Sequence, residues 1–259
     1  MKNLIKYSRL QFGIALIAFG IQHFIVGSFT IGSAPPWPTS VPGGLLWAYL
    51  SGLFLFLTGT MLLINKTATP FLMITGMMIF IWAFVRDLPI FIPHPVYDGF
   101  LTSIGEALAM TGCSFIVANS IIKENKPYEG FSFFIWMEKI VPVGSIFIGA
   151  FLLICGVQHF ILTEYCQSLV PTWIPGSLFW TYFAGVALIT CGIGLMWWRV
   201  RKVAAFCSGL MVFIWMLILH SLRVARNIHD VNEWSSLLET ISLSAALFVL
   251  ACSTKKSSA

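Results

Sequence analysis

Eight apolar runs, each close to 20 residues long, constrain this chain more than any other feature. A helix rises about 1.5 Å per residue, so about 20 residues cross the roughly 30 Å hydrocarbon core of a bilayer. In lipid, an α-helix satisfies its backbone hydrogen bonds internally. The runs therefore predict an all-α membrane protein with eight transmembrane helices, at approximately residues 8–30, 44–64, 69–90, 100–121, 140–163, 176–198, 203–225 and 235–252.

Composition supports this prediction and excludes other classes. Hydrophobic residues make up 58% of the chain and charged residues 10%, and the mean hydropathy is +0.88. Soluble domains carry about 25% charged residues, so lipid is the natural solvent of this chain. The run after Arg9 lacks a small-residue cleavage pattern, which predicts a retained helix rather than a signal peptide. The formal charge of +5 does not indicate nucleic acid, because the basic residues flank the runs.

The basic residues also predict the orientation. Twelve of the 15 fall on one side of the predicted membrane, and only Arg86, Arg223 and Arg226 lie towards the other. Basic residues favour the cytoplasmic side, so we expect both termini in the cytoplasm of a bacterial-type inner membrane. The opposite side carries loops rich in Pro and Trp, at 35–38 and 171–175, whose tryptophans suit a membrane interface.

An internal repeat divides the chain into two units. The stretch GIQHFI at 20–25 recurs 136 positions later as GVQHFI, and PGGLLWAY at 42–49 recurs 133 positions later as PGSLFWTY. GMMIFIW at 76–82 recurs as GLMVFIW at 209–215, and Glu106 matches Glu239. Each unit has four spans and so enters and leaves on the same side. We predict two parallel four-helix repeats, 1–122 and 140–259, joined by a charged cytoplasmic linker at 123–139 that contains Pro127 and Gly130.

Six ionisable residues inside the runs form the candidate site. Such residues are costly in lipid unless they are paired or hydrated, so each needs an explanation. Counted along the helices, all six fall in the outer third of the membrane, and Asp87 aligns with His220, so the units differ there. The candidates are His23, Asp87, Glu106, His159, His220 and Glu239.

Their chemistry leaves several readings open. A His beside a carboxylate can move protons, which suits quinone reduction or acid–base work on an isoprenoid lipid. The same pairs could instead fix helix packing. Metal or haem is disfavoured because the spacings show neither HxxxH nor HExxH. We expect the three outer arginines to extend to the surface. The six cysteines form no CxxC pair, and Cys166 falls in a predicted loop.

Each unit resembles the DoxX-like membrane proteins. The resemblance rests on Gly-x-x-His-Phe late in the first helix, a Pro/Trp loop, and Pro-x-x-x-x-Trp-x-Tyr-x-x-Gly at the start of the second, as at 42–52 and 175–185. A second helix rich in small residues and an acidic residue in the fourth complete it. The resemblance implies a four-helix bacterial inner-membrane unit, linked in some members to a thiosulfate:quinone oxidoreductase or to thiol and superoxide detoxification. Because the sequence has no CxxC cysteine pair, a role in thiol redox chemistry is disfavoured.

The sequence thus predicts a redox-associated membrane subunit that binds a quinone or another lipid at a polar site near the outer face. Its expected partners are membrane lipid and a redox partner protein, with no nucleic acid. Two alternatives stay open. One is a stand-alone enzyme that uses Glu and His on a hydrophobic lipid. The other is a binding or transport protein without chemistry.

Overall fold

A computed structural model describes residues 2–31, 37–64, 68–92, 100–124 and 131–253. Pro35, Pro36, Pro127 and Gly130 lie outside these ranges. Within them, eight helical spans are long and apolar enough to cross a membrane, as predicted. The first half contains α1 (Lys2–Val26), α2 (Gly44–Leu63), α3 (Ala68–Phe91) and α4 (Phe100–Ile122). The first helix begins six residues before the predicted run and ends four residues before its limit.

The second half has more breaks. Its elements are α5 (Ser132–Ile140), the 3-10 turn η1 (Val141–Val143), α6 (Gly144–Ile161), α7 (Thr163–Leu169), α8 (Ser177–Met196), α9 (Arg201–Trp215), the π-helix η2 (Met216–His220), α10 (Ser221–Arg226) and α11 (Val231–Ser253). Helix α5 lies mostly within the predicted linker. Cys166, predicted in a loop, belongs to the short helix α7, where partial burial raises the pKa of its thiol.

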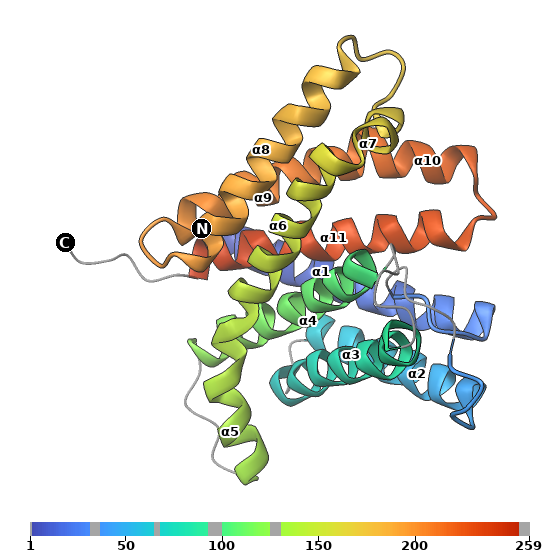
Figure 1. Cartoon of the computed structure of the whole chain (residues 1–259). Coiled ribbons are helices and arrows are strands. Elements are labelled where there is room, and N and C mark those ends of the chain that lie inside the picture. The colour runs from blue at the N-terminus through green and yellow to red at the C-terminus, as the bar shows by residue number, and fades with distance from the viewer. Residues whose placement is uncertain (1, 32–36, 65–67, 93–99, 125–130, 254–259) are drawn as a thin grey trace.

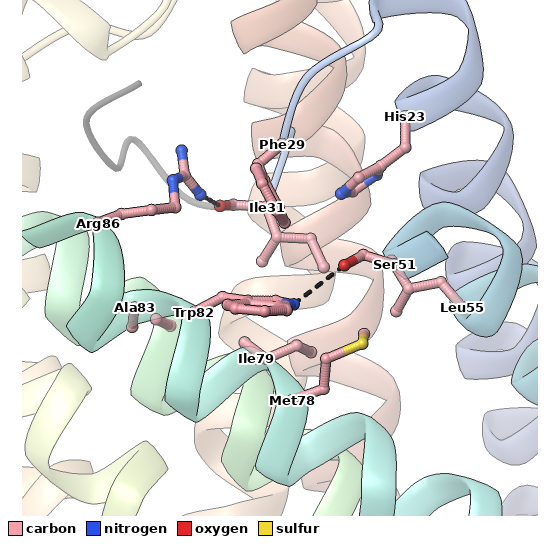
Figure 2. Close-up of a pocket in the computed structure, with 11 residues that line it drawn as sticks. His23, Phe29, Ile31, Ser51, Leu55, Met78, Ile79, Trp82, Ala83 and Arg86 are labelled. Atoms are coloured by element: carbon pink, nitrogen blue, oxygen red, sulfur yellow. Dashed lines mark hydrogen bonds between the residues drawn. The ribbon is translucent and has the colours of Figure 1, made fainter. Parts of the chain in front are cut away.

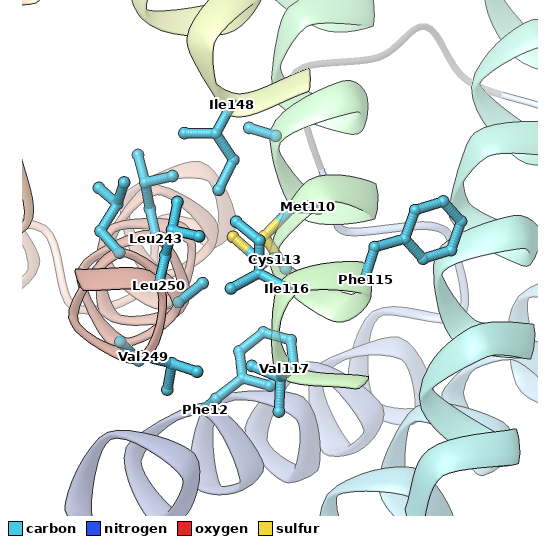
Figure 3. Close-up of a cluster of buried hydrophobic side chains, with 14 of the residues drawn as sticks. Phe12, Met110, Cys113, Phe115, Ile116, Val117, Ile148, Leu243, Val249 and Leu250 are labelled. Carbon is cyan, nitrogen blue, oxygen red and sulfur yellow. The ribbon is translucent and has the colours of Figure 1, made fainter. Parts of the chain in front are cut away.

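Helices α4 and α11 form the centre of the molecule (Figure 1). In their membrane spans 72% and 67% of residues are buried, against 28–44% in the other six. Side chains such as Met110, Cys113 and Ile116 of α4 face Leu243 and Leu250 of α11 across this core, as Figure 3 shows. Helix α4 packs against α3 and α6, and α11 packs against α1 and α9, while α2 and α8 lie against α1 and α6.

Glutamine side chains join the two halves near the end of the bundle away from the termini. Gln22 of α1 donates from Nε2 to Ser235 Oγ and Val231 O of α11, both at 3.1 Å. Gln158 of α6 donates from Nε2 to Thr102 Oγ1 of α4 at 2.7 Å. Gln158 follows Gln22 by 136 positions and Ser235 follows Thr102 by 133, the two offsets of the sequence repeat. The first helix of each half therefore bonds to the last helix of the other.

Candidate functional site

A small chamber lies among α1, α2, α3 and α4, towards the end of the bundle away from the termini (Figure 2). About 20 Å³ is open to the centre of a water-sized sphere, which is room for roughly one water molecule. Two ionisable side chains, His23 and Arg86, line it together with aromatic and aliphatic groups. The remaining lining residues are Phe29, Ile31, Ser51, Leu55, Met78, Ile79, Trp82, Ala83 and Ala107.

A glycine on α2 creates the space in which His23 sits. A Cβ on Gly52 would lie 2.7 Å from His23 Cβ, so any larger residue there would push α1 and α2 apart. The matched residues in the second half repeat this contact, because a Cβ on Gly185 would lie 3.0 Å from His159 Cβ. The glycine that ends the repeated Pro-x-x-x-x-Trp-x-Tyr-x-x-Gly pattern thus has a physical role, since it lets a histidine pack between two helices.

Hydrogen bonds set the tautomer of His23. Its Nδ1 lies 2.8 Å from Phe19 O and 3.0 Å from Thr30 Oγ1, and the side chain is only 1% exposed. A carbonyl oxygen only accepts, so Nδ1 carries the hydrogen and donates it. In the neutral ring, Nε2 therefore holds the lone pair. His159 has the same arrangement, with Nδ1 2.7 Å from Cys155 O. Both rings offer Nε2 as a proton acceptor.

Arg86 corrects an expectation drawn from the sequence. It does not extend to the surface but is 5% exposed, with its guanidinium carbon 5.2 Å from the centre of the Phe29 ring. Nη1 donates a long hydrogen bond of 3.4 Å to Ile31 O, which Figure 2 shows. The reason is that the chain after α1 folds back over the end of α3 and covers it. Arg86 is thus a functional candidate that depth counting misjudged.

Trp82 lines the chamber, and further aromatic rings pack against it. The Trp37 ring stacks on Phe29 at 5.2 Å and meets Trp82 edge-on at 5.4 Å, and Trp47 also contacts Trp82 at 5.4 Å. Trp82 Nε1 donates to Ser51 Oγ at 3.0 Å, so its polar edge is satisfied. Trp37 comes from the Pro/Trp loop that the sequence assigned to the membrane interface, and it packs against Phe29 and Trp82, two residues that line the chamber.

Asp87 lies beside the chamber and is also buried. It is 1% exposed, and Oδ1 accepts a 2.8 Å hydrogen bond from Ser103 of α4. Its Oδ2 is buried without a hydrogen-bond partner among the described residues. Arg86, a potential counter-charge, is its neighbour in the chain. The first half therefore brings His23, Arg86 and Asp87 to one end of the bundle.

The second half carries different chemistry at its matched positions. Ala184 stands where the first half has Ser51, and Leu219 where it has Arg86. Its cation is Arg223 of α10, which makes two 2.8 Å hydrogen bonds to Glu233 of α11. His220 ends the π-helix η2, a type of turn that is frequent at functional sites, and its Nδ1 is buried without a hydrogen-bond partner among the described residues. Glu233 was not among the sequence candidates.

Glu106 of α4 and Glu239 of α11 occupy matched positions in the two halves. The sequence suggested one His–Glu pair in each unit, and that pairing stays a prediction. The Nδ1 atoms of both histidines bond to carbonyl oxygens of their own helices, which leaves Nε2 for such a partner. Within the described ranges, no three His, Cys, Asp or Glu side chains gather as a metal site.

Comparison with known proteins gives one match. No curated protein and no solved structure matches the chain. Residues 148–255 match the model of a family described as a domain of unknown function, DUF8561. The matched segment begins inside α6 and so lies wholly within the second half of the chain.

Proposed function

We propose that the protein is a tandem DoxX-like membrane protein that binds the headgroup of a quinone or a similar lipid at the His23–Arg86 chamber. The observation that carries this proposal is the burial of Arg86 beside His23 in an aromatic chamber. A buried guanidinium is costly in a bilayer and marks a functional site by default. In this reading the protein is a redox-associated subunit rather than a complete enzyme.

The side chains suit a quinone headgroup. Its carbonyl oxygen accepts hydrogen bonds, and the Arg86 guanidinium has several donors in a fixed plane. Its flat ring can stack on Trp82 or Phe29, an arrangement worth about 0.5–1.5 kcal/mol beyond the buried area. Reduction of a quinone to a quinol consumes two electrons and two protons. Protonated His23 can deliver one proton from Nε2 and water the other, and a redox partner protein supplies the two electrons.

The size of the chamber implies movement on binding. A headgroup is larger than the single water molecule for which there is room, and small-molecule sites are typically about 300–1,000 Å³. Phe29 and Trp37 follow α1 in the chain; Phe29 lines the chamber and Trp37 stacks on it. Displacement of these two rings would open the space between His23 and Trp82. We therefore expect binding to change the environment of Trp37 and Trp82, which provides a spectroscopic signal.

The repeat and the orientation belong to the same proposal. The glutamine bonds between the halves and the glycine–histidine contacts occur at matched positions, which supports two parallel four-helix units. The DUF8561 match lies inside the second unit, which supports the boundary near residue 140. With the termini in the cytoplasm of a bacterial-type inner membrane, the chamber faces the outer leaflet.

The test is quinone binding by the purified full-length protein. Lipids are extracted and the retained quinone is quantified, and a short-chain ubiquinone is then titrated while tryptophan fluorescence is followed. We expect saturable quenching, and we expect the quinone affinity derived from it to fall at least tenfold in Arg86→Gln and His23→Ala. His159→Ala is the matched control in the second half and keeps the wild-type affinity. Absence of retained quinone together with unsaturable quenching would refute the proposal.

A further inference from the structure

The short helix α5 is not needed to cross the membrane. Helix α6 has 18 residues, or roughly 27 Å at about 1.5 Å per residue, and the 3-10 turn η1 extends it further. That length already matches a hydrocarbon core of roughly 30 Å. The nine residues of α5 precede Pro142, which lies in η1. The span formed by η1 and α6 is therefore long enough without α5, which precedes it in the chain.

The direction of α5 agrees with this argument. Figure 1 shows that α5 runs across the direction of α1, α4 and α11, at the end of the bundle where the N-terminus lies. A helix that crosses the bundle axis at its end runs along the membrane surface rather than through it. Its first residue follows the C-terminal end of α4 by ten positions, so α5 stays near that end.

Helix α5 combines buried and exposed apolar residues. Met137 of α5 and Val141 of the following turn η1 are fully buried against the protein. Phe133 is 39% exposed and Trp136 is 51% exposed, with their rings 6.2 Å apart. Exposed Lys139 follows one turn later. An aromatic pair beside a lysine is typical of helices that lie in the interfacial layer of a membrane.

The end of the bundle around α5 is basic. Exposed lysines or arginines stand at the start of α1, after α4, in the last turn of α5 and after α8, at Lys2, Lys6, Lys123, Lys139 and Arg199. Two acidic residues also lie at this end: Glu124, which is bonded to Arg9 at 2.7 Å, and Glu138, which precedes Lys139 in α5 and is partly buried. Two further tryptophans, Trp197 and Trp198, are exposed just past α8. Basic side chains near a membrane surface attract anionic lipids, by about 1 kcal/mol each.

From these observations we propose that α5 is an interfacial anchor whose Phe133–Trp136–Lys139 face lies in the headgroup layer of the leaflet nearest the termini and selects anionic phospholipid. Met137 and Val141 connect this anchor to the protein core, so the anchor holds α6 at a set depth. This proposal is independent of quinone binding, because the chamber lies at the opposite end of the bundle.

The test uses full-length protein in nanodiscs that contain equal amounts of phosphatidylglycerol and phosphatidylcholine. A photoreactive benzoylphenylalanine replaces Phe133 or Trp136, one at a time, and adducts are weighed by mass spectrometry. Phe206, which is 48% exposed on α9, is replaced in the control protein. We expect lipid adducts from all three, with phosphatidylglycerol favoured at least twofold at 133 and 136 and not at 206. Lys139→Gln should reduce that preference towards one.

Three outcomes would overturn the proposal. A covalent dimer as the main product would assign the face to a second copy of this chain. Protein without adducts at 133 and 136, but with adducts at 206, would place α5 outside the lipid. Equal labelling of the two lipids at 133 and 136 would show that this face does not select anionic phospholipid. Because the photoreactive substitutions could disturb α5, the double variant Phe133→Gln/Trp136→Gln is measured too. We expect the wild type to have a higher melting temperature in anionic than in neutral nanodiscs. The double variant should lose this difference.

Discussion

Gln158 Nε2 donates a 2.7 Å hydrogen bond to Thr102 Oγ1, and this bond joins the first helix of the second half to the last helix of the first. Gln22 and Ser235 make the reciprocal bond at 3.1 Å. Both bonds cross between α4 or α11 and a helix of the other half, so each half completes the packing of the other. The two halves are therefore one folded body and not two independent bundles.

Replacement of either glutamine should weaken the packing between the two halves and so destabilise the protein. We expect Gln158→Leu to lower the free energy of unfolding by about 1 kcal/mol, because interhelical hydrogen bonds in membranes contribute about 0.6–2 kcal/mol. Thermal unfolding in detergent measures the change. In a double-mutant cycle with Thr102→Ala, the loss should be less than additive, with a coupling of at least about 0.5 kcal/mol. Additive losses would mean that this bond contributes nothing to stability.

The glycines that make room for the two histidines should not tolerate a methyl group. Overpacking of a filled interface costs about 1–3 kcal/mol. Gly52→Ala should cost more than Gly185→Ala, because its Cβ would lie 2.7 Å from His23 Cβ, which is fixed to the backbone, whereas at Gly185 the atom at 2.7 Å is Cε2 of the Phe160 ring, which can move away. The melting temperatures of both variants are compared with that of Leu53→Ala, whose side chain is 46% exposed. A Gly52→Ala protein as stable as wild type would contradict the close packing.

The tryptophans of the two halves offer a matched comparison. Trp82 donates a 3.0 Å hydrogen bond to Ser51, whereas in the second half the residues matched to this pair are Trp215 and Ala184, which has no hydroxyl group. Trp82→Phe should therefore destabilise the protein by about 1 kcal/mol more than Trp215→Phe does. Chemical unfolding of both variants measures the difference. In a Ser51→Ala background the difference should disappear, and its persistence would argue against this hydrogen bond as the cause.

The ion pair between α10 and α11 should stabilise the second half. Glu233 has a side chain that is 9% exposed and would remain buried without a counter-charge in Arg223→Gln. Loss of one partner of a buried pair costs about 3–5 kcal/mol. Because Arg223 is 30% exposed, we expect a smaller loss of about 2 kcal/mol. Exposed Arg226→Gln is the control and should leave the unfolding midpoint unchanged. The double variant Arg223→Gln/Glu233→Gln should recover part of the loss.

The sequence by itself determined the spans, since lipid requires runs of about 20 apolar residues and leaves the chain little alternative. The sequence also revealed the Gly-x-x-His-Phe motif, because both halves carry it at the same place in their first spanning helix. The sequence did not predict the direction in which each side chain points. Hydropathy counts depth along a helix axis but does not say which neighbour a residue faces.

Only the tertiary structure decided how the polar groups are used. Arg86 and Asp87 are adjacent near the end of α3, and depth alone suggested that the arginine reaches the surface. The chain after α1 folds back and buries it under Phe29. Gln22 and Gln158 look like neighbours of the histidines in sequence, yet they bond to the opposite half. Such contacts depend on how helices distant in sequence rotate and pack, and a pattern along one chain does not contain that rotation.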